Sequence, residues 1–429
     1  MLLSAGFIGL FFAPSGLRPG YAERRPPSRA SLLLLQLVWF AIYFDSGMAK
    51  YFGGDPSWHN GTALDQYCQN GPLPTWIAWY AQQLPHWFHA ATTVLTLVVE
   101  LLLVWMLFLP RRFRIACFVI VTSLQAGIIL TANYAFLNYL VLSLGILLLD
   151  DRLLVKLFPK RWTRAVRDNL RGRPPTAGET PAAEEVSALL SAADGGLEQP
   201  ASDAPREEPR VASQRPLLQH AGALGSIIGL WLTGFVLAWL LYADVFLVVA
   251  QVTRRAVLPA GPVTLLEPFR VANPYGLFGR MTWRRYEVEF QGSSDGRRWV
   301  AYPFRYKPQD LSEAPGIFAP YQPRFDWNLW FASLGTWRNA PWVLRCEQLL
   351  LSNDPDVIAL FRRNPFAQAP PRDVRAVLWR YWFTDAAARR ATGRWWRREY
   401  LGLYAPALER APDGSLVVTA IPGPPPPPP

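Results

Sequence analysis

The chain has 429 residues, of which 51% are hydrophobic and 14% aromatic, and its formal net charge is +11. This length suffices for a membrane part and one soluble domain, because single domains usually have about 100–200 residues. The arginines lie beside apolar runs, and neither a recognition helix nor a zinc spacing accompanies them. We therefore expect the positive charge to reflect membrane topology, and we exclude nucleic acid as a partner.

Apolar runs that are long enough, or nearly long enough, to cross a bilayer recur along the chain. They comprise residues 31–48, 91–109, 115–132, 134–149 and 221–250. A further apolar run at residues 1–14 is shorter than a span and lacks the basic start and cleavage site of a signal peptide. We expect a polytopic α-helical membrane bundle of about six spans, the first of them truncated, with a tight helical hairpin at Asn133.

The placement of positive charge predicts the orientation of these spans. Arginine and lysine gather at residues 18–29, 111–114 and 152–167, whereas residues 51–90 contain neither. Because positively charged loops stay on the cytoplasmic side, residues 51–90 and everything after the last run should be exoplasmic. The pair Arg254 and Arg255 departs from this rule, which a long translocated domain tolerates.

Composition divides the chain into five parts. The segment before the last apolar run is rich in Ala, Pro, Glu, Asp and Ser and cannot form a core, and the final segment is nearly all proline. We predict a transmembrane domain at residues 1–150, a cytoplasmic basic segment and disordered linker at 151–220, the last transmembrane helix at 221–250, an exoplasmic domain at 251–410 and a disordered proline-rich tail at 411–429.

The exoplasmic domain is expected to mix helices and strands. Its apolar residues alternate with polar ones in some segments and recur at helical spacing in others. The expected elements are a strand at 286–290, a turn at 292–296, a returning strand at 302–306, a helical segment at 327–361 broken at 352–355, and a strand at 374–383. The first two strands form a β-hairpin, so the fold class of this domain is α+β.

Three cysteines are present, at positions 68, 117 and 346. Cys68 and Cys346 would both be exoplasmic and could pair, or all three could remain separate thiols. No CxxC sequence occurs, so neither a redox motif nor a zinc site is indicated. We expect no metal and no cofactor.

A structured loop is predicted where the first long apolar run reaches the exoplasmic side. Lys50 ends that run, and Gly-Gly-Asp55-Pro and Trp58 follow it. Tryptophans at such a place are typical of an interfacial aromatic belt. Two interpretations stay open: Lys50 extends to water and fixes the loop at the interface, or the loop forms a polar pocket.

Glu100 lies deep within the run at 91–109. A carboxylate inside a membrane is costly and normally faces a partner or a cavity. Lys50, His89 and Gln125 are the candidate partners. A structural ion pair and a reactive pocket are both compatible with this pattern.

The exoplasmic domain contains none of the chain's four histidines, so serine-triad hydrolysis there is excluded. Asp326 and Asp373 stand among arginines and aromatic residues, which indicates ion pairing. Exposed tryptophan and tyrosine among arginines suit protein binding, although most of the 19 tryptophans must fill core and membrane belt.

Several long and uncommon motifs resemble those of the lipase maturation factor family. In the exoplasmic part they are NPYGLFG at 273–279, FRYKP at 304–308, APYQPRFDW at 319–327, WFA at 330–332, NPF at 364–366, PPR at 370–372, RY at 380–381 and GRWWR at 393–397. The membrane part adds AGFIGLF at 5–11, residues 50–64, WFH at 87–89 and NY at 138–139.

This resemblance implies a multi-spanning folding factor that helps secreted lipases to mature, with a folding client, in particular a lipase, and the lipid bilayer as partners. It implies the endoplasmic reticulum membrane in a eukaryotic host and the inner membrane in a bacterium, with the C-terminal domain exoplasmic. The residues that it singles out for client binding or as family motifs are Asp55, Trp58, Arg324, Asp326, Trp327, Trp330, Asn364, Pro365, Phe366, Arg380, Tyr381, Trp395 and Trp396.

The chain also departs from the family pattern. We expect the leading spans of the family to be lacking, and Tyr67-Cys-Gln-Asn70 stands where a histidine and an acidic residue would be expected. This second departure puts a family-wide chemical role of the loop in doubt.

The membrane half also resembles the horizontally transferred transmembrane domain, which vitamin K-dependent γ-carboxylase shares. That resemblance implies an alternative function, a membrane enzyme that acts at the exoplasmic face through Lys50, His89 and Glu100. A transporter is a third hypothesis, which the single intramembrane carboxylate and the absence of an internal repeat disfavour.

Overall fold

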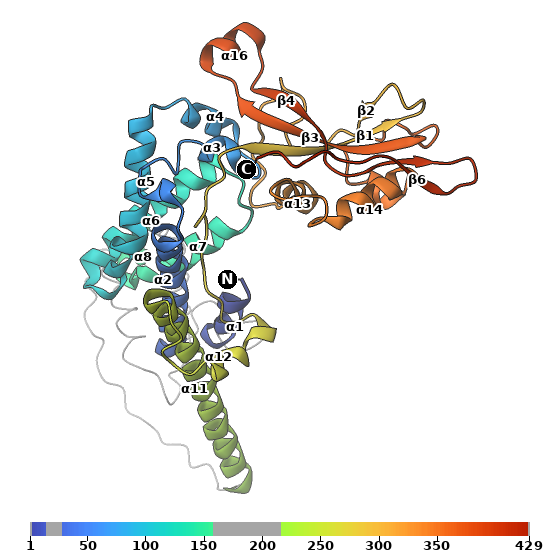
Figure 1. Ribbon diagram of the computed structural model, residues 1–429. Helices are drawn as coiled ribbons and strands as arrows, with labels where there is room; N and C mark the ends of the chain where they lie inside the picture. Colours follow the sequence, from blue (N-terminus) through green and yellow to red (C-terminus); the bar gives the residue numbers. More distant parts are fainter. Residues whose placement is uncertain (1, 14–27, 158–215, 428–429) are drawn as a thin grey trace, which may run out of the picture. The chain divides into compact units, whose positions relative to one another are not determined.

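The computed structural model describes residues 2–13, 28–157 and 216–427, and it divides into two compact units (Figure 1). The first unit comprises Met1–Ala49, Val99–Val121 and Val141–Leu277, and the second comprises Lys50–Val98, Thr122–Leu140 and Phe278–Pro429. The chain therefore passes repeatedly between the units. The loops that we expected to be exoplasmic belong to the same unit as the C-terminal part.

Four helical segments are long and apolar enough to cross a membrane. They are Arg29–Phe52 (α2), His86–Phe108 (α5, His86–Leu101, with the 3₁₀ helix η2, Leu103–Phe108), Arg111–Thr131 (α6) and Trp231–Thr253, the latter part of α11 (Pro216–Thr253). Leu2–Phe12 (α1) and Leu137–Leu148 (α7, Leu137–Gly145, with η3, Ile146–Leu148) are shorter apolar helices. Several membrane-spanning helices are thus present, but the expected count of about six is not confirmed.

Close packing around α2 organises the first unit. A Cβ atom on Gly47 would lie 2.9 Å from Cβ of Glu100, so glycine is required for the approach of α2 to the end of α5. Near the carboxyl end of α2, the backbone N–H of Tyr275 donates to Asp45 and that of Leu277 donates to Ser46, at 3.4 and 3.3 Å. These bonds hold residues 275–277, at the end of the first unit's last segment, against α2.

The remaining helices in the described residues of the first unit are short. They are α8 (Asp151–Leu157), α12 (Gly261–Thr264) and η4 (Glu267–Phe269). The linker predicted to be disordered falls almost wholly on residues 158–215, which lie outside the described residues.

An antiparallel sheet forms the centre of the second unit (Figure 1). Its order is β2-β1-β3-β5-β6, and β4 pairs with another part of β3. The strands are β1 (Arg285–Ser293), β2 (Val300–Ala301), β3 (Asp373–Phe383), β4 (Trp396–Leu403), β5 (Ala407–Arg410) and β6 (Leu416–Ala420). The α+β class that we expected for the C-terminal part agrees with this sheet-containing region.

One face of the sheet packs on helices. Figure 1 shows α13 (Arg324–Ser333) and α14 (Pro341–Leu350) against it, and Val288, Phe290 and Ala376 are fully buried in the core between them. The opposite face of β1 carries Arg285 and glutamates, which are buried as well. Polar and apolar residues alternate along β1, as the sequence analysis noted, but both faces of the strand are buried.

The hairpin between β1 and β2 is present, but its second strand is shorter than we expected. β2 ends at Ala301, and Tyr302 still donates its N–H to Phe290 O at 2.9 Å. The N–H of Phe304 then donates to the Gln309 side chain at 2.9 Å. This bond turns the chain away from the sheet, so the prediction of a strand over 302–306 was wrong.

The predicted helical segment at 327–361 is interrupted between α13 and α14. Asn339 accepts hydrogen bonds from the N–H and hydroxyl of Thr336, which stabilises a turn there. A further break precedes α15 (Pro355–Ile358), where Asp354 accepts from two backbone N–H groups. The sequence analysis placed this second break correctly and missed the first.

Four elements of the C-terminal part were not foreseen: β4, β5, β6 and α16 (Ala386–Thr392). We predicted a disordered tail at residues 411–429, but β6 lies within this segment. It pairs with β5 across a tight turn. Beyond the sheet, Tyr286 donates its hydroxyl to Pro427 O at 2.9 Å.

Glu347 is a buried carboxyl in the core of the second unit. It is fully buried on α14, which packs on β3, and its pKa lies well above the ordinary 4.5 because burial disfavours the charge. A hydrogen bond from the backbone of Ala376 offsets only part of this effect. Between pH 4.5 and the raised pKa, the folded chain keeps a proton that the unfolded chain releases, so stability falls as pH rises.

We predict that Glu347→Gln removes this pH dependence and stabilises the full chain at neutral pH. Thermal unfolding of the detergent-solubilised protein between pH 5 and 8 measures the effect. Glu313→Gln, at an exposed position, is the matched control and should leave the slope unchanged. An unaltered slope in Glu347→Gln would contradict the assignment.

Candidate functional site

The candidate site is the set of contacts inside the second unit between the loops at 50–98 and 122–140 and the C-terminal part from residue 278 onward. We call this set the junction. It is built largely from the family-type motifs, and each contact joins segments that are far apart in the sequence.

Asp55 fixes the first loop of the junction. Its carboxylate caps the 3₁₀ helix η1 (Pro56–Trp58) by accepting from Ser57 N at 2.9 Å, and it accepts from Met281 N at 2.7 Å. Burial alone would raise the pKa of Asp55, but these hydrogen bonds and the charge of Arg280 together lower it. The charged form therefore holds the loop to the C-terminal part.

Indole and amide groups extend this contact. Trp58 Nε1 donates to Phe278 O at 3.1 Å, and Asn70 Nδ2 donates to Thr282 O at 2.6 Å. Trp330 on α13 donates its indole N–H to Asn70 O at 3.0 Å. Because each bond uses a backbone carbonyl, the junction depends on the backbone conformation of both partners.

Arg285, at the start of β1, is the most connected side chain of the junction. It is buried, and it donates to the carbonyl oxygens of Gln69, Gly71 and Pro72, with 2.8 Å to Gln69 O and 3.0 Å to Pro72 O. Its guanidinium also forms an ion pair with Glu287 and lies 5.2 Å from the ring centre of Trp396. A desolvated guanidinium requires such a set of acceptors.

Glu287 also binds a second cation. Lys307, of the FRYKP motif, lies 2.6 Å from its carboxylate and donates to Val288 O at 3.0 Å. The backbone N–H of Lys307 in turn donates to Asp326 on α13 at 3.0 Å. Burial raises the pKa of Asp326, and the Lys307 charge offsets part of that effect. Asp326 is therefore a structural carboxyl that positions this motif.

The side chain of Asn133 connects the helical hairpin to the C-terminal part, and both its amide N–H groups and its oxygen form hydrogen bonds. Nδ2 donates to Leu73 O and Gly316 O, both at 3.0 Å. Oδ1 accepts from Phe318 N at 2.6 Å and from Ala319 N at 3.0 Å. The hairpin turn predicted at Asn133 thus fixes residues 316–319.

A second apolar core joins α4 (Trp76–Gln82) and α3 (Tyr67–Asn70) to the sheet. It contains Cys68, Trp79, Tyr381, Phe383 and Trp396. Trp396 and Phe383 lie 4.2 Å apart between ring centres, and Trp79 donates to Thr384 at 3.3 Å. Tyr381 and Trp396, two of the predicted site residues, are therefore core residues of the junction.

Trp395 takes part through stacking. The guanidinium of Arg389 on α16 lies 3.5 Å from its ring centre and 4.7 Å from that of Trp79. Such contacts between arginine and tryptophan contribute on the order of 0.5–1 kcal/mol each at exposed sites.

The other predicted site residues have local roles or are exposed. Asn364 accepts from Phe366 N at 2.9 Å, and Phe366 packs on Gly292, where a Cβ atom would lie 2.5 Å away. The guanidinium of Arg380 lies 4.4 Å from the ring centre of Trp382. Trp327 makes an edge-to-face contact with Tyr134, with 6.0 Å between the ring centres, whereas Arg324 is exposed. Pro365, between Asn364 and Phe366 in the chain, is half-buried.

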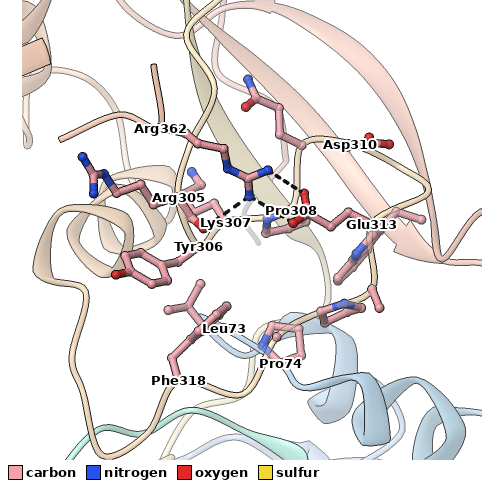
Figure 2. A pocket seen from close by; sticks show the side chains of 15 residues that line it. Leu73, Pro74, Arg305, Tyr306, Lys307, Pro308, Asp310, Glu313, Phe318 and Arg362 are labelled. Carbon is pink, nitrogen blue, oxygen red and sulfur yellow. Dashed lines mark hydrogen bonds and ion pairs between the residues drawn. The ribbon is translucent and has the colours of Figure 1, made fainter. Parts of the chain in front are cut away.

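A cavity of about 100 Å³ opens beside the junction (Figure 2). Figure 2 shows Arg362 reaching Glu313 at its mouth, at 3.0 Å, with Leu73, Pro74 and Phe318 on the opposite side. This volume accommodates roughly three water molecules. It is too small for a lipid or a folded segment.

The residues of the enzyme hypothesis belong to both units. Lys50 is buried and its Nζ lies 5.4 Å from the ring centre of Trp58, while His89 Nε2 lies 3.0 Å from Leu84 O. Both belong to the second unit, and Glu100 belongs to the first, where it packs against Gly47. The contacts of Lys50 and His89 support the shape of the loop.

The three cysteines are free and buried. Cys68 and Cys346 therefore do not pair, and burial raises the pKa values of their thiols to about 12 and about 11. Within the described parts of the chain, no group of three or more His, Cys, Asp and Glu residues could hold a metal ion.

Comparison with known proteins gives two family matches. The family model described as the lipase maturation factor transmembrane domain matches residues 1–156, and the one described as the lipase maturation factor C-terminal domain matches residues 271–406. Lipase maturation factor 1 of Homo sapiens is 31% identical over 415 residues, which cover 95% of this chain and 65% of that protein. Lipase maturation factor 1 of Bos taurus is 30% identical, with 95% and 67% covered.

This chain belongs to the lipase maturation factor family. Lipase maturation factor 2 of Homo sapiens is also similar, with 30% identity over 475 residues that cover 95% of this chain and 65% of the relative. The chain thus spans about two-thirds of the length of these curated relatives. No solved structure matches it.

The family resemblance drawn from the motifs is confirmed. The structure adds what many of the motif residues do. Asp55, Trp58, Trp330 and Trp396 hold the junction together, and Asp326 positions the motif at 304–308 within the C-terminal part. The sequence analysis missed Arg285, Asn133 and Glu287. A buried polar or charged side chain whose partners come from distant segments has no local sequence pattern by which it could have been found.

We predict that Arg285→Met destabilises the protein by about 3–5 kcal/mol, because it leaves three carbonyl groups without a donor and weakens the pairing of Glu287. Thermal unfolding and the rate of proteolysis within residues 67–76 measure the loss. Arg297→Met, at an exposed arginine of the β1–β2 turn, should change neither. Equal behaviour of the two variants would disprove the role of Arg285.

For Asn133, replacement by alanine removes four hydrogen bonds and should cost about 2 kcal/mol or more. Asn133→Asp keeps the acceptor but loses both donors, so it should destabilise the protein too. Asn328→Ala, at an exposed position of α13, serves as the control. A thermal-shift assay in detergent measures the effect. Equal melting temperatures of Asn133→Ala and Asn328→Ala would exclude this role of Asn133.

Proposed function

We propose that this protein is a membrane-bound maturation factor for secreted lipases or similar exported proteins, and that it binds them through its C-terminal part. The observation that carries the proposal is its membership in a family whose curated relatives are named lipase maturation factors. Helices that are long and apolar enough to span a membrane support the membrane location.

Exposed apolar side chains of the second unit support the binding role. Ile317, Tyr321 and Phe331 are exposed by 52%, 58% and 54%, and they lie on α13 or in the segment just before it. Arg324 is exposed on the same helix. Large apolar side chains that stay exposed are candidate contacts for another protein. We propose that this α13 surface contacts apolar parts of incompletely folded clients.

The motif residues of the junction have a supporting role in this proposal. Because they are mostly buried, they position the client-binding surface and do not contact the client. In a eukaryotic host we propose the endoplasmic reticulum membrane with the C-terminal part in the lumen, and in a bacterium the inner membrane with that part in the periplasm.

Site-specific crosslinking tests the proposal. A photoreactive amino acid at Phe331 should capture a newly made secreted lipase, whereas the same group at Arg297, in the β1–β2 turn, should capture little. Deletion of the gene should lower the yield of active lipase. Absence of any captured lipase, together with an unchanged yield, would rule out the proposed function.

A further inference from the structure

β6 is an edge strand whose residues are all exposed. Leu416, Val417 and Val418 are exposed by 46%, 45% and 53%, and Thr419 and Ala420 are exposed as well. β5 pairs with one side of β6. In the described part of the chain, no strand pairs with its other side.

The hydrogen-bond pattern identifies which backbone groups face outward. The β5–β6 turn is closed by Ala411 N donating to Ser415 O at 2.9 Å, so the next pair, Arg410 and Leu416, is a non-hydrogen-bonded pair. Consistent with this, Arg410 directs its N–H away from β6, to Arg372 O at 2.9 Å. The N–H and C=O groups of Leu416 and Val418 therefore point to the open edge.

This edge lacks two of the features that usually protect edge strands, namely charged residues and proline. Natural sheets prevent unwanted pairing with charged residues, proline or bulges on their edge strands. From Leu416 to Ile421 the sequence is LVVTAI, which contains neither a charge nor a proline. The β5–β6 ladder contains one bulge: Leu408 pairs with Val418 and Ala407 with Ala420, so Thr419 of β6 is the extra residue. This bulge lies beyond Leu416 and Val418, whose backbone groups face the open edge.

We propose that β6 binds an extended segment of a folding client, which adds to the sheet as a further strand. This proposal rests on the proposed function and specifies one of its binding modes. Strand addition uses main-chain hydrogen bonds for affinity, so it tolerates many sequences. It suits a client that has unpaired backbone groups and has not yet formed a fixed surface.

A second copy of this chain fits the edge less well. Stable interfaces bury about 1,200–2,000 Å² in total, and two strands of five residues lying side by side bury far less. Each copy also carries a formal net charge of +11, which opposes self-association. A short edge gives weak and reversible binding, as a folding factor requires for release.

Substitutions at Val418 test the proposal in the full chain reconstituted in nanodiscs. Val418→Pro removes one outward-facing N–H and leaves the Glu409–Val417 pair intact, while Val418→Ala removes side-chain atoms and keeps the N–H. The probe is a fluorescein-labelled bacterial triacylglycerol lipase, unfolded in urea and diluted into the assay. We expect Val418→Pro to weaken binding about tenfold or more, and Val418→Ala by less than about twofold.

Hydrogen exchange with single-residue resolution gives a second readout that needs no substitution. The amides of Leu416 and Val418 should exchange fast in the free protein and slowly with the unfolded lipase, whereas the amide of Val417 should be protected in both states. This distinguishes a paired edge from a change elsewhere in the protein, and it also shows whether Val418→Pro leaves β5–β6 folded.

The outcomes separate the two proposals. Lipase binding that is equal in all variants, without protection of Leu416 and Val418, overturns strand addition and leaves the proposed function in place. Absence of lipase binding by the unaltered chain overturns the proposed function itself. A dimer that Val418→Pro dissociates, with lipase binding unchanged, would assign the edge to a second copy and overturn the proposal.

Discussion

The burial of the Arg285 guanidinium is the constraint on which the second unit depends. A charged group that is removed from water needs hydrogen-bond acceptors. For Arg285 these are the Glu287 carboxylate and three backbone carbonyl groups of the loop at residues 69–72. This requirement forces β1 to lie against a loop that precedes it by more than 200 residues. The loop between membrane helices and the C-terminal sheet therefore form one folded unit, and neither is complete without the other.

This arrangement changes how the family-type motifs are interpreted. The motifs recur in both halves of the chain, and the natural first hypothesis is a set of client contacts. Instead, Asp55 and Trp58 bind backbone groups across the junction, and Lys307 pairs with Glu287 within the C-terminal part. Asn133, which belongs to none of the motifs, also binds backbone groups across the junction. Their chemistry is specific because backbone carbonyls and amides have fixed directions, and a substitution leaves a buried group unpaired. The exposed residues of α13, of which only Arg324 belonged to the predicted site, are better placed to contact another protein.

The sequence predicted those features that have a local periodic signal. Apolar length indicated the long helices, and the alternation around Val288 and the run before Phe383 indicated β1 and β3. β4 was missed because its two adjacent arginines, Arg397 and Arg398, hide the period of a half-buried strand. The burial of Glu287 could not be predicted either, since a glutamate that faces water and one that pairs with two cations give the same sequence pattern. Such partners come from loops far away in the sequence, and only the tertiary structure brings them together.

The junction and the exposed edge are connected through the register of the sheet. β6 pairs only with β5, β5 pairs with β3 over Asp373 and Val374, and β3 pairs with β1 along its whole length from Arg285 to Ser293. A slip of one residue between β5 and β6 would reverse which backbone groups of Val418 face outward. Arg285 holds the first residue of β1 against the loop at 69–72, and the pairing of β1 with β3 begins at this residue, opposite Tyr381. A binding edge that offers only backbone groups needs this rigid register, because it has few side-chain contacts that could correct an error.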